Sequence, residues 1–200
     1  MNPNTAPDWS ELAGIARDWW RQLRPGPSRK GDRAALARLR RAATTGEALM
    51  EPETIDLCRK LGVSARTRAP TPGRVAALAA VLAHVTQEVD PPIIGGGGRP
   101  GMMRLVGPQS TDKTVREAAK LKETRFRALM SARADDELLT SMRRLVALTG
   151  GKANLRDLAR TMLSWSEKTR TRWAFEYYGA MAPSSENATS SPPIATEGVP

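Results

Sequence analysis

Residues 71–85 of the chain read TPGRVAALAAVLAHV, a stretch with the spacing and the start signal of an α-helix. Thr71 and Pro72 are typical of a helix start, because a threonine side chain caps the first turn and proline fits the first helical position. Apolar side chains then recur at helical spacing along one narrow seam: Val75, Leu78, Leu82, Val85 and Val89. The alanines between them are small, so a neighbouring helix can approach this one closely.

The same spacing recurs on both sides of this stretch. Asp8 and Asp32 are positioned to cap two helices, and Pro25-Gly26-Pro27 ends the first of them. We expect helices over residues 8–23, 32–43, 52–62, 112–131, 135–149, 154–165 and 169–181. No alternation of apolar and polar residues is long enough for a strand, so the sequence predicts an all-α protein.

Two segments interrupt the helical pattern. Residues 90–111 contain PPIIGGGG and RPG, and glycine at this density is incompatible with a helix. The segment lacks the Gly-Lys-Ser/Thr ending and the preceding strand of a phosphate loop. We expect a two-lobed helical bundle of about seven to nine helices joined by a glycine-rich loop: an N-terminal lobe over residues 8–89, a flexible connection over 90–111, a C-terminal lobe over 112–181 and a disordered tail over 182–200.

The composition excludes several classes of protein. With one cysteine, Cys58, the chain forms no internal disulfide, and the single histidine, His84, leaves too few ligands for a zinc site of the common kind. No apolar run is long enough to span a membrane, and residues 1–12 lack the features of a signal peptide. We therefore expect a cytoplasmic protein with no metal, no cofactor and no membrane partner.

The reactive residue types form no catalytic pattern. His84 lies in the alanine-rich stretch, and no recognisable pattern supplies it with a catalytic partner. We therefore expect a histidine that is packed in the core or exposed on the surface. Cys58 shares a predicted helix face with apolar residues and is expected in the core. Three acidic residues, 135–137, open a helix, where the helix dipole favours them. The sequence therefore predicts a protein without catalytic residues or enzymatic activity.

The chain carries a net charge of +10, and arginine supplies 24 of its 31 cations. Arginine binds phosphate bidentately, so this balance favours a polyanionic partner, although a solvated basic surface has the same composition. The arginines lie beside the apolar seams of predicted helices: Arg33, Arg40 and Arg41 in residues 32–43, Arg125 and Arg127 in residues 112–131, and Arg143 and Arg144 in residues 135–149. Folded together, they would form one positive groove along a nucleic-acid backbone.

From about Asp8 to Tyr178, the helical segments come in a definite order: WWRQLRPG (19–26), DRAALARLRRA (32–42), TPGRVAALAAVLAHV (71–85), LKETRFRALM (121–130), DELLTSMRRLVAL (136–148), LRDLARTMLSW (155–165) and RWAFEYY (172–178). This ordered set resembles the small subunit of the type I-E CRISPR surveillance complex Cascade, the CasB family. Each segment by itself is only a helix with arginines. The resemblance therefore rests on their order, and it leaves out residues 90–111 and the tail.

The resemblance implies an all-helical, two-lobed protein without enzymatic activity. Its implied partners are the guide RNA, the target and displaced DNA strands, the large and backbone subunits of Cascade, and a second copy of itself. At matching positions it implies nucleic-acid contacts by these residues: Arg40, Arg41, Arg74, Arg125, Arg127, Arg143 and Arg144. Arg33 is added only because it lies seven residues before Arg40 and therefore shares a helix face with it. Lys122 departs from the family pattern, where serine is usual, and the segment 90–111 is long.

Two other classes of protein stay open. A helix-turn-helix regulator needs two helices joined by a tight turn, the second reading base edges, and residues 155–165 with a neighbour are a candidate although Asn and Gln are scarce there. An assembly scaffold would turn its arginines toward acidic protein surfaces. We favour a subunit that binds the backbone of guide RNA and target DNA without reading sequence and stabilises the R-loop in antiviral defence.

Overall fold

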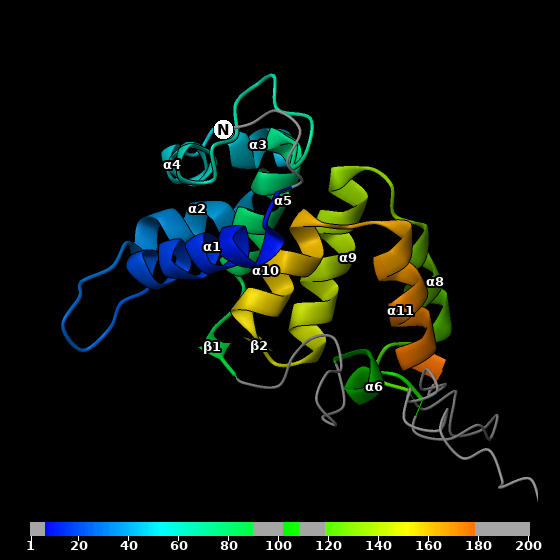
Figure 1. Cartoon of the computed structure of the whole chain (residues 1–200). Coiled ribbons are helices and arrows are strands. Elements are labelled where there is room, and N and C mark those ends of the chain that lie inside the picture. The colour runs from blue at the N-terminus through cyan, green and yellow to red at the C-terminus, as the bar shows by residue number, and fades with distance from the viewer. Residues whose placement is uncertain (1–6, 90–101, 109–118, 179–200) are drawn as a thin grey trace, which may run out of the picture.

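A computed structural model of the chain describes residues 7–89, 102–108 and 119–178 (Figure 1). The fold is an all-α bundle, which confirms the predicted fold class. The helices are α1 (Trp9–Leu23), α2 (Arg33–Arg41), α3 (Thr45–Leu49), α4 (Pro52–Lys60), α5 (Pro72–Leu82), α6 (Met102–Val106), α8 (Glu123–Ser131), α9 (Asp135–Leu148), α10 (Leu155–Leu163) and α11 (Glu167–Tyr178). In these described residues, no helix combines the length and apolar character that crossing a membrane requires.

The predicted capping residues start the helices as expected. Asp8 accepts hydrogen bonds from the backbone N–H groups of the first turn of α1, and Asp32 accepts one from Ala35 in α2. Thr71 does the same for α5, and Asn154 for α10. Each cap satisfies a donor that the helix itself leaves without a partner, so these short polar residues determine where the helices begin.

α5 is the helix on which the others pack. Every side chain from Val75 to Ala83 is fully buried, and α5 contacts α2, α3, α4, α9 and α10. The sequence predicts one narrow apolar seam, but alanine presents apolar surface on every side of the helix, so neighbours cover all of it. The inclusion of Val89 in this seam is wrong. The helix ends at Leu82, and four residues later the N–H of Thr86 donates to the carbonyl oxygen of Gly151 at 2.8 Å.

Two further local predictions are wrong, and one helix was not predicted. The helix expected over residues 112–131 is not continuous, because residues 119–122 are not helical and α8 begins at Glu123; residues 112–118 lie outside the described part. The turn of helix α3, capped by Thr44, was not predicted. α6 lies inside the segment 90–111, where no helix was expected. The described residues of this helix contain no glycine, and Met103 and Val106, one helical turn apart, are buried in the core.

A two-strand parallel pair, β1 (Gln87–Glu88) and β2 (Lys152–Ala153), joins the end of α5 to the start of α10. Two-residue strands are too short to produce an alternating pattern, so the sequence does not reveal them. β1 matters for the site below, because it draws the chain away from the end of α5, and the carbonyl groups of Ala83, Val85 and Thr86 between that helix and β1 accept from side-chain donors.

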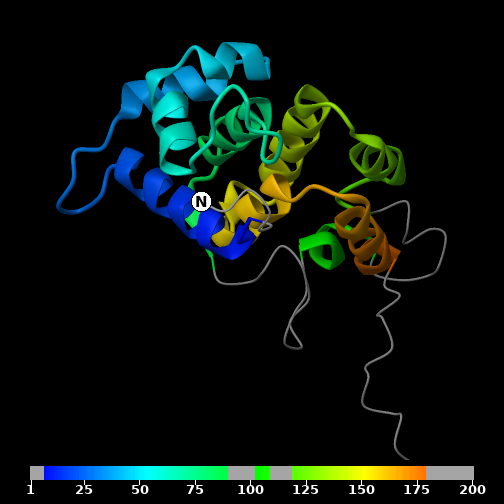
Figure 2. The same ribbon diagram turned by 45° about the horizontal axis from the view of Figure 1, so that its top comes forward.

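Contacts cross the boundary that the sequence analysis draws at residues 90–111. α10 packs along α1 and α5, α9 packs on α5 and α3, and one hydrophobic cluster includes residues from both sides. α6, α8 and α11 lie beside this body, on the side opposite the loop between α1 and α2 in Figures 1 and 2. The division into lobes at the stated residues stays a prediction. The ranges 90–101 and 179–200, with most of the predicted connection and the whole tail, lie outside the described residues.

Candidate nucleic-acid interface

The C-terminal end of α5 is surrounded by arginine side chains. Arg40, in the last turn of α2, donates from Nε to the carbonyl oxygen of Ala83 at 2.6 Å. Arg24, directly after α1, donates from Nη2 to the carbonyl oxygen of Thr86 at 2.7 Å and from Nη1 to that of Val85 at 3.3 Å. Ala83 follows α5 directly, and Val85 and Thr86 come shortly after it, so these carbonyl groups lie near the negative end of the helix dipole, where cations are favourable.

A third arginine reaches the same region from α9. Arg143 donates from Nη2 to the carbonyl oxygen of Leu39 at 3.1 Å, next to Arg40 at the end of α2. Burial lowers the pKa of the Arg143 guanidinium, and the negative charge of Glu47 opposes this only in part. The Nε of Arg143 is buried and has no hydrogen-bond partner among the described residues. We call Arg24, Arg40 and Arg143 the arginine cluster.

The charges of the arginine cluster act on Arg24 and on the neighbouring His84. Burial and then the positive charge of Arg40 lower the pKa of Arg24. His84, half-buried just after α5, has a pKa below its usual value because of burial first and then the charge of Arg143; the charge of Arg40 also lowers it, while a backbone hydrogen bond with Arg40 opposes the shift. Like charges are therefore held close enough to destabilise one another's charged forms.

The hydrogen bonds that the described residues show for the arginine cluster end on main-chain carbonyls. Other arginines are paired with carboxylates instead: Arg17 and Arg21 with Glu88, and Arg38 with Glu51 and Glu53. Arg24 has one further contact, with its guanidinium 5.3 Å from the centre of the Trp20 ring, a distance typical of a cation–π interaction. The cluster is thus held by neutral groups, which leave its positive charge uncompensated by hydrogen-bonded acids.

Three other predicted residues lie on the same helices as the cluster. Arg33 and Arg41 are exposed at the two ends of α2, and Arg144 is exposed on α9 next to Arg143. The loop between α1 and α2 also carries the exposed Arg29 and Lys30, which the sequence analysis did not single out. Figure 2 shows this loop projecting from the body of the molecule.

Arg74 has a different environment from the other predicted residues. It donates from Nε to Oδ1 of Asp135 at 2.6 Å and from Nη1 to the carbonyl oxygen of Met162 at 3.1 Å. The hydroxyl of Thr71 donates to the other oxygen of Asp135 at 3.1 Å. Arg74 therefore connects the start of α5 to α9 and α10, and its side chain is only 15% exposed.

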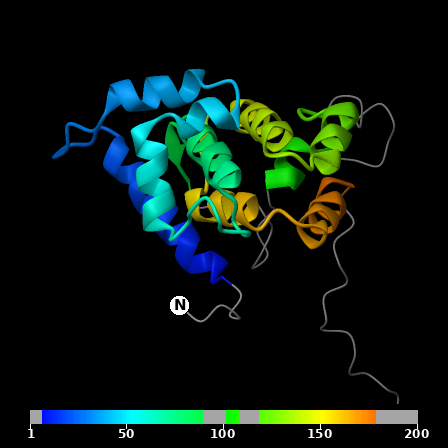
Figure 3. The same ribbon diagram turned by 90° about the horizontal axis from the view of Figure 1, so that it is seen from above.

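Arg125 and Arg127 lie on α8, away from the arginine cluster. Arg125 is exposed, whereas Arg127 forms an ion pair of 2.7 Å with Glu123 one helical turn earlier. α8 and the loop between α1 and α2 lie at opposite ends of the molecule in Figure 3, as in the other two views. The eight predicted arginines thus divide between two regions and one interior contact, rather than lining a single groove.

The sequence analysis did not identify Arg24 as a site residue, and it did not place His84 beside the arginine cluster. The signal for Arg24 was its place between a helix and Pro25, where a basic side chain can turn back onto nearby carbonyl groups. The partner carbonyls are more than 60 residues away in the chain, so no local pattern names them. Trp19 and Trp173 are buried in the core, and Trp165 packs against it partly buried. Cys58 is buried as expected, and burial raises the pKa of its thiol.

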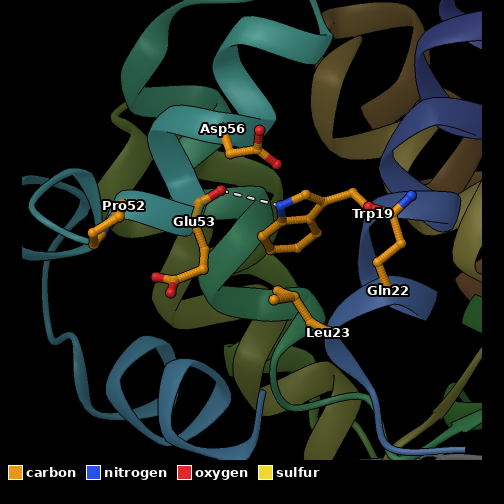
Figure 4. A pocket seen from close by; sticks show the side chains of 6 residues that line it. All are labelled: Trp19, Gln22, Leu23, Pro52, Glu53 and Asp56. Atoms are coloured by element: carbon orange, nitrogen blue, oxygen red, sulfur yellow. Dashed lines mark hydrogen bonds between the residues drawn. The ribbon is translucent and has the colours of Figure 1, made fainter. Parts of the chain in front are cut away.

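A surface pocket between α1 and α4 offers no site for a polyanion (Figure 4). The indole of Trp19 forms its wall and donates to the carbonyl oxygen of Glu53 at 3.1 Å. The carboxylates of Glu53 and Asp56 belong to its lining, and they would repel phosphate. Among the described residues, no group of three or more His, Cys, Asp or Glu side chains is arranged to hold a metal ion.

Comparison with known protein families gives one match, which spans most of the chain. The model of the family described as CRISPR-associated protein Cse2 matches residues 35–178. The matched range includes Arg40 and Arg143 but begins after Arg24. No curated protein and no solved structure matches the chain.

Proposed function

Since this chain belongs to the family of CRISPR-associated protein Cse2, the small subunits of type I-E Cascade, we propose that its arginine cluster binds the sugar–phosphate backbone of the nucleic acids in that complex. The ligands are the guide RNA and the target and displaced DNA strands. By holding their phosphates, the subunit stabilises the R-loop in antiviral defence without reading base sequence. We further propose that it works in the cytoplasm and contacts the large subunit, the backbone subunits and a second copy of itself.

The observation that carries this proposal is the accumulation of like charge at one helix end. One cation is enough to satisfy a helix C-terminus, and it does so without repulsion. Here Arg40 and Arg24 donate to carbonyl groups just after α5, and Arg143 lies close enough to act on His84. After burial, neighbouring positive charge is the next cause that lowers the pKa of Arg24 and of His84. A bound polyanion removes that repulsion, so the arrangement favours phosphate more than a single capping arginine does.

The hydrogen-bonding capacity of the cluster suits this task. A guanidinium has five N–H donors, and the described contacts of Arg40 and Arg24 use one and two of them on carbonyl oxygens. The carbonyl contacts orient each group, and remaining donors are available for phosphate oxygens. Phosphate contacts position a strand but carry no sequence information. Because R-loop formation is nearly balanced in free energy, a few such contacts decide whether the open state persists.

We propose a non-catalytic role for the subunit. The thiol of Cys58 is buried with a raised pKa, the opposite of what an activated nucleophile needs. Burial and then the charge of Arg143 lower the pKa of His84, and its buried Nε2 has no partner among the described residues. A histidine acting as general base is normally oriented by an acceptor such as a carboxylate. Base pairing between guide and target supplies the sequence specificity instead.

The test compares two double variants of the full chain that remove equal charge. Arg40→Gln/Arg143→Gln alters the cluster, and Arg59→Gln/Arg66→Gln alters two exposed arginines that belong to no predicted or proposed binding site. Affinity for a labelled single-stranded RNA and DNA is measured by fluorescence anisotropy across a range of salt. We expect the cluster variant to lower the slope of log affinity against log salt by about 1.4–1.8, and the control to leave it unchanged.

Arg41→Gln/Arg144→Gln is a second test variant. Its folding is less at risk than that of the cluster variant, because these two side chains make no main-chain contact among the described residues. Circular dichroism and urea unfolding check that each variant is folded. Equal slopes for wild type, cluster variant and control would overturn the proposal. Protection of one DNA sequence over all others would favour a helix-turn-helix regulator. Loss of complex assembly by a protein with no affinity for RNA or DNA would favour a scaffold.

A further inference from the structure

The outer face of α11 exposes aromatic and basic side chains together. Phe175 is 51% exposed and Tyr178 is 39% exposed, and both belong to the small set of large hydrophobic side chains that the described residues leave open to solvent. Lys168 and Arg172 are exposed on the same helix. Residues three and four apart lie side by side on a helix, so these positions share one face. We call them the α11 face: Lys168, Arg172, Phe175 and Tyr178.

The packing of α11 depends on its other side. Trp173 and Tyr177 are fully buried, and the Tyr177 ring stacks on Phe126 of α8 with ring centres 3.8 Å apart. The Tyr177 hydroxyl donates to the carbonyl oxygen of Leu121 at 2.8 Å, and Trp173 meets Trp165 edge to face at 5.4 Å. These contacts fix the helix firmly. The Phe175 ring is therefore held in the open on a rigid support to which it adds little packing.

The surroundings of the Phe175 ring are basic. Arg172 lies one turn before it; burial and then the charge of Arg160 lower the pKa of Arg172, more than the charges of Glu176 and Asp157 raise it. On α8, which packs against Tyr177 of α11, Arg125 is exposed, and Glu123 accepts from the Tyr178 hydroxyl at 3.2 Å while pairing with Arg127. A protein-binding patch is typically depleted in lysine, whereas cations beside an open aromatic ring are typical of single-strand binding.

We propose that the α11 face is a stacking site for unpaired bases of a single-stranded nucleic acid. A base lies on the Phe175 ring, and Lys168 and Arg172 bind the phosphates on either side of it. The α11 face lies away from the arginine cluster, so it is a second point of contact; it rests on the proposed function only for the class of ligand. Duplex DNA meets only the cations of this face, because its bases are stacked on one another and cannot reach the ring.

The experiment uses a short single strand with one 2-aminopurine, whose fluorescence falls on stacking, and a matched duplex. Removing one base–aromatic contact costs about 1–3 kcal/mol, so Phe175→Ala should weaken single-strand binding by about 5- to 150-fold and abolish the quenching. Duplex affinity and the salt slope should not change. Phe175→Trp should keep both affinity and quenching. Met50→Ala is the matched control, because Met50 is an apolar side chain 83% exposed on a different part of the molecule.

The outcomes separate this inference from the proposed function. If Phe175→Ala binds the single strand like wild type while the Arg40→Gln/Arg143→Gln variant is weakened, the stacking site is wrong and the proposed function stands. If neither the wild type nor any variant binds nucleic acid, the proposed function itself is wrong. If Phe175→Ala impairs assembly with partner subunits but leaves single-strand binding intact, the α11 face is a protein contact and the inference is overturned.

Discussion

Arg143 donates a hydrogen bond from Nη2 to the carbonyl oxygen of Leu39 at 3.1 Å, across 104 residues of sequence. This contact joins the middle of α9 to the end of α2, beside Arg40. One guanidinium therefore both holds two helices together and contributes charge to the arginine cluster. Its neighbour Arg144 is exposed and contributes charge alone.

Charge reversal separates these two roles. Arg143→Glu places a carboxylate against the Leu39 carbonyl oxygen, so we expect the free energy of unfolding to fall by about 2–3 kcal/mol. Arg144→Glu is a surface change and should alter it by less than about 0.5 kcal/mol. Urea unfolding followed by circular dichroism measures both. Equal stability of the two variants would show that the Arg143 contact has no packing role.

Arg74 is expected to matter for stability and not for binding. Arg74→Ala leaves Asp135 with only the Thr71 hydroxyl as a described side-chain donor, so we expect a loss of about 2–3 kcal/mol in the free energy of unfolding. Arg66→Ala, in an exposed loop, is the control and should have little effect. Measured below the unfolding transition, the affinity of Arg74→Ala for single-stranded RNA should equal that of wild type. If the variant is folded but binds RNA more weakly than wild type, Arg74 contributes to binding and the prediction is wrong.

His84 should make the protein less stable in acid. Its pKa is lowered in the folded state, so below its ordinary value of 6.5 the unfolded chain binds a proton that the folded protein does not. The free energy of unfolding should therefore fall as the pH drops below about 6.5, by at most about 1.4 kcal/mol per pH unit from this residue.

His84→Gln removes this contribution while carboxylates titrate equally in both proteins. The difference in stability between wild type and His84→Gln, from urea unfolding at pH 5–7.5, should therefore change with pH below 6.5 and be constant above it. A constant difference over the whole range would mean that folding leaves the pKa of His84 unchanged.

Gly31 should control the shape of the loop before α2. Its φ is +60°, and an added Cβ would lie 2.4 Å from the backbone N of Pro25 and 2.7 Å from the carbonyl oxygen of Leu23. Those backbone atoms cannot move without opening the loop. The loop is closed by a hydrogen bond of 2.8 Å from the N–H of Asp32 to the carbonyl oxygen of Leu23.

We expect Gly31→Ala to cost about 1–3 kcal/mol of stability and to weaken RNA binding, because Arg24 begins this loop. Gly26→Ala in the same loop meets no atom within 4 Å and is the control. Thermal unfolding and anisotropy measure the two effects. A Gly31→Ala protein as stable as Gly26→Ala would contradict this account of the turn.

Much of the fold follows from local sequence. Asp8, Asp32, Thr71 and Asn154 start helices where the pattern indicates, because capping acts over three residues and needs no tertiary contact. The burial of α5 follows from its alanine-rich composition. The two-residue strands and α6 were beyond prediction, since their stability comes from partners far away in the chain, such as Gly151 for Thr86.

The sequence by itself determined most of the helices, the excess of positive charge and the elements that carry it. Only the tertiary structure decided what each arginine meets. Arg38 and Arg40 lie two residues apart on α2, yet Arg38 pairs with the carboxylates of Glu51 and Glu53, whereas Arg40 donates to the carbonyl of Ala83. Helical periodicity gives the direction of a side chain around its own axis. The crossing of one helix over another determines whether a carboxylate, a carbonyl or solvent lies in that direction.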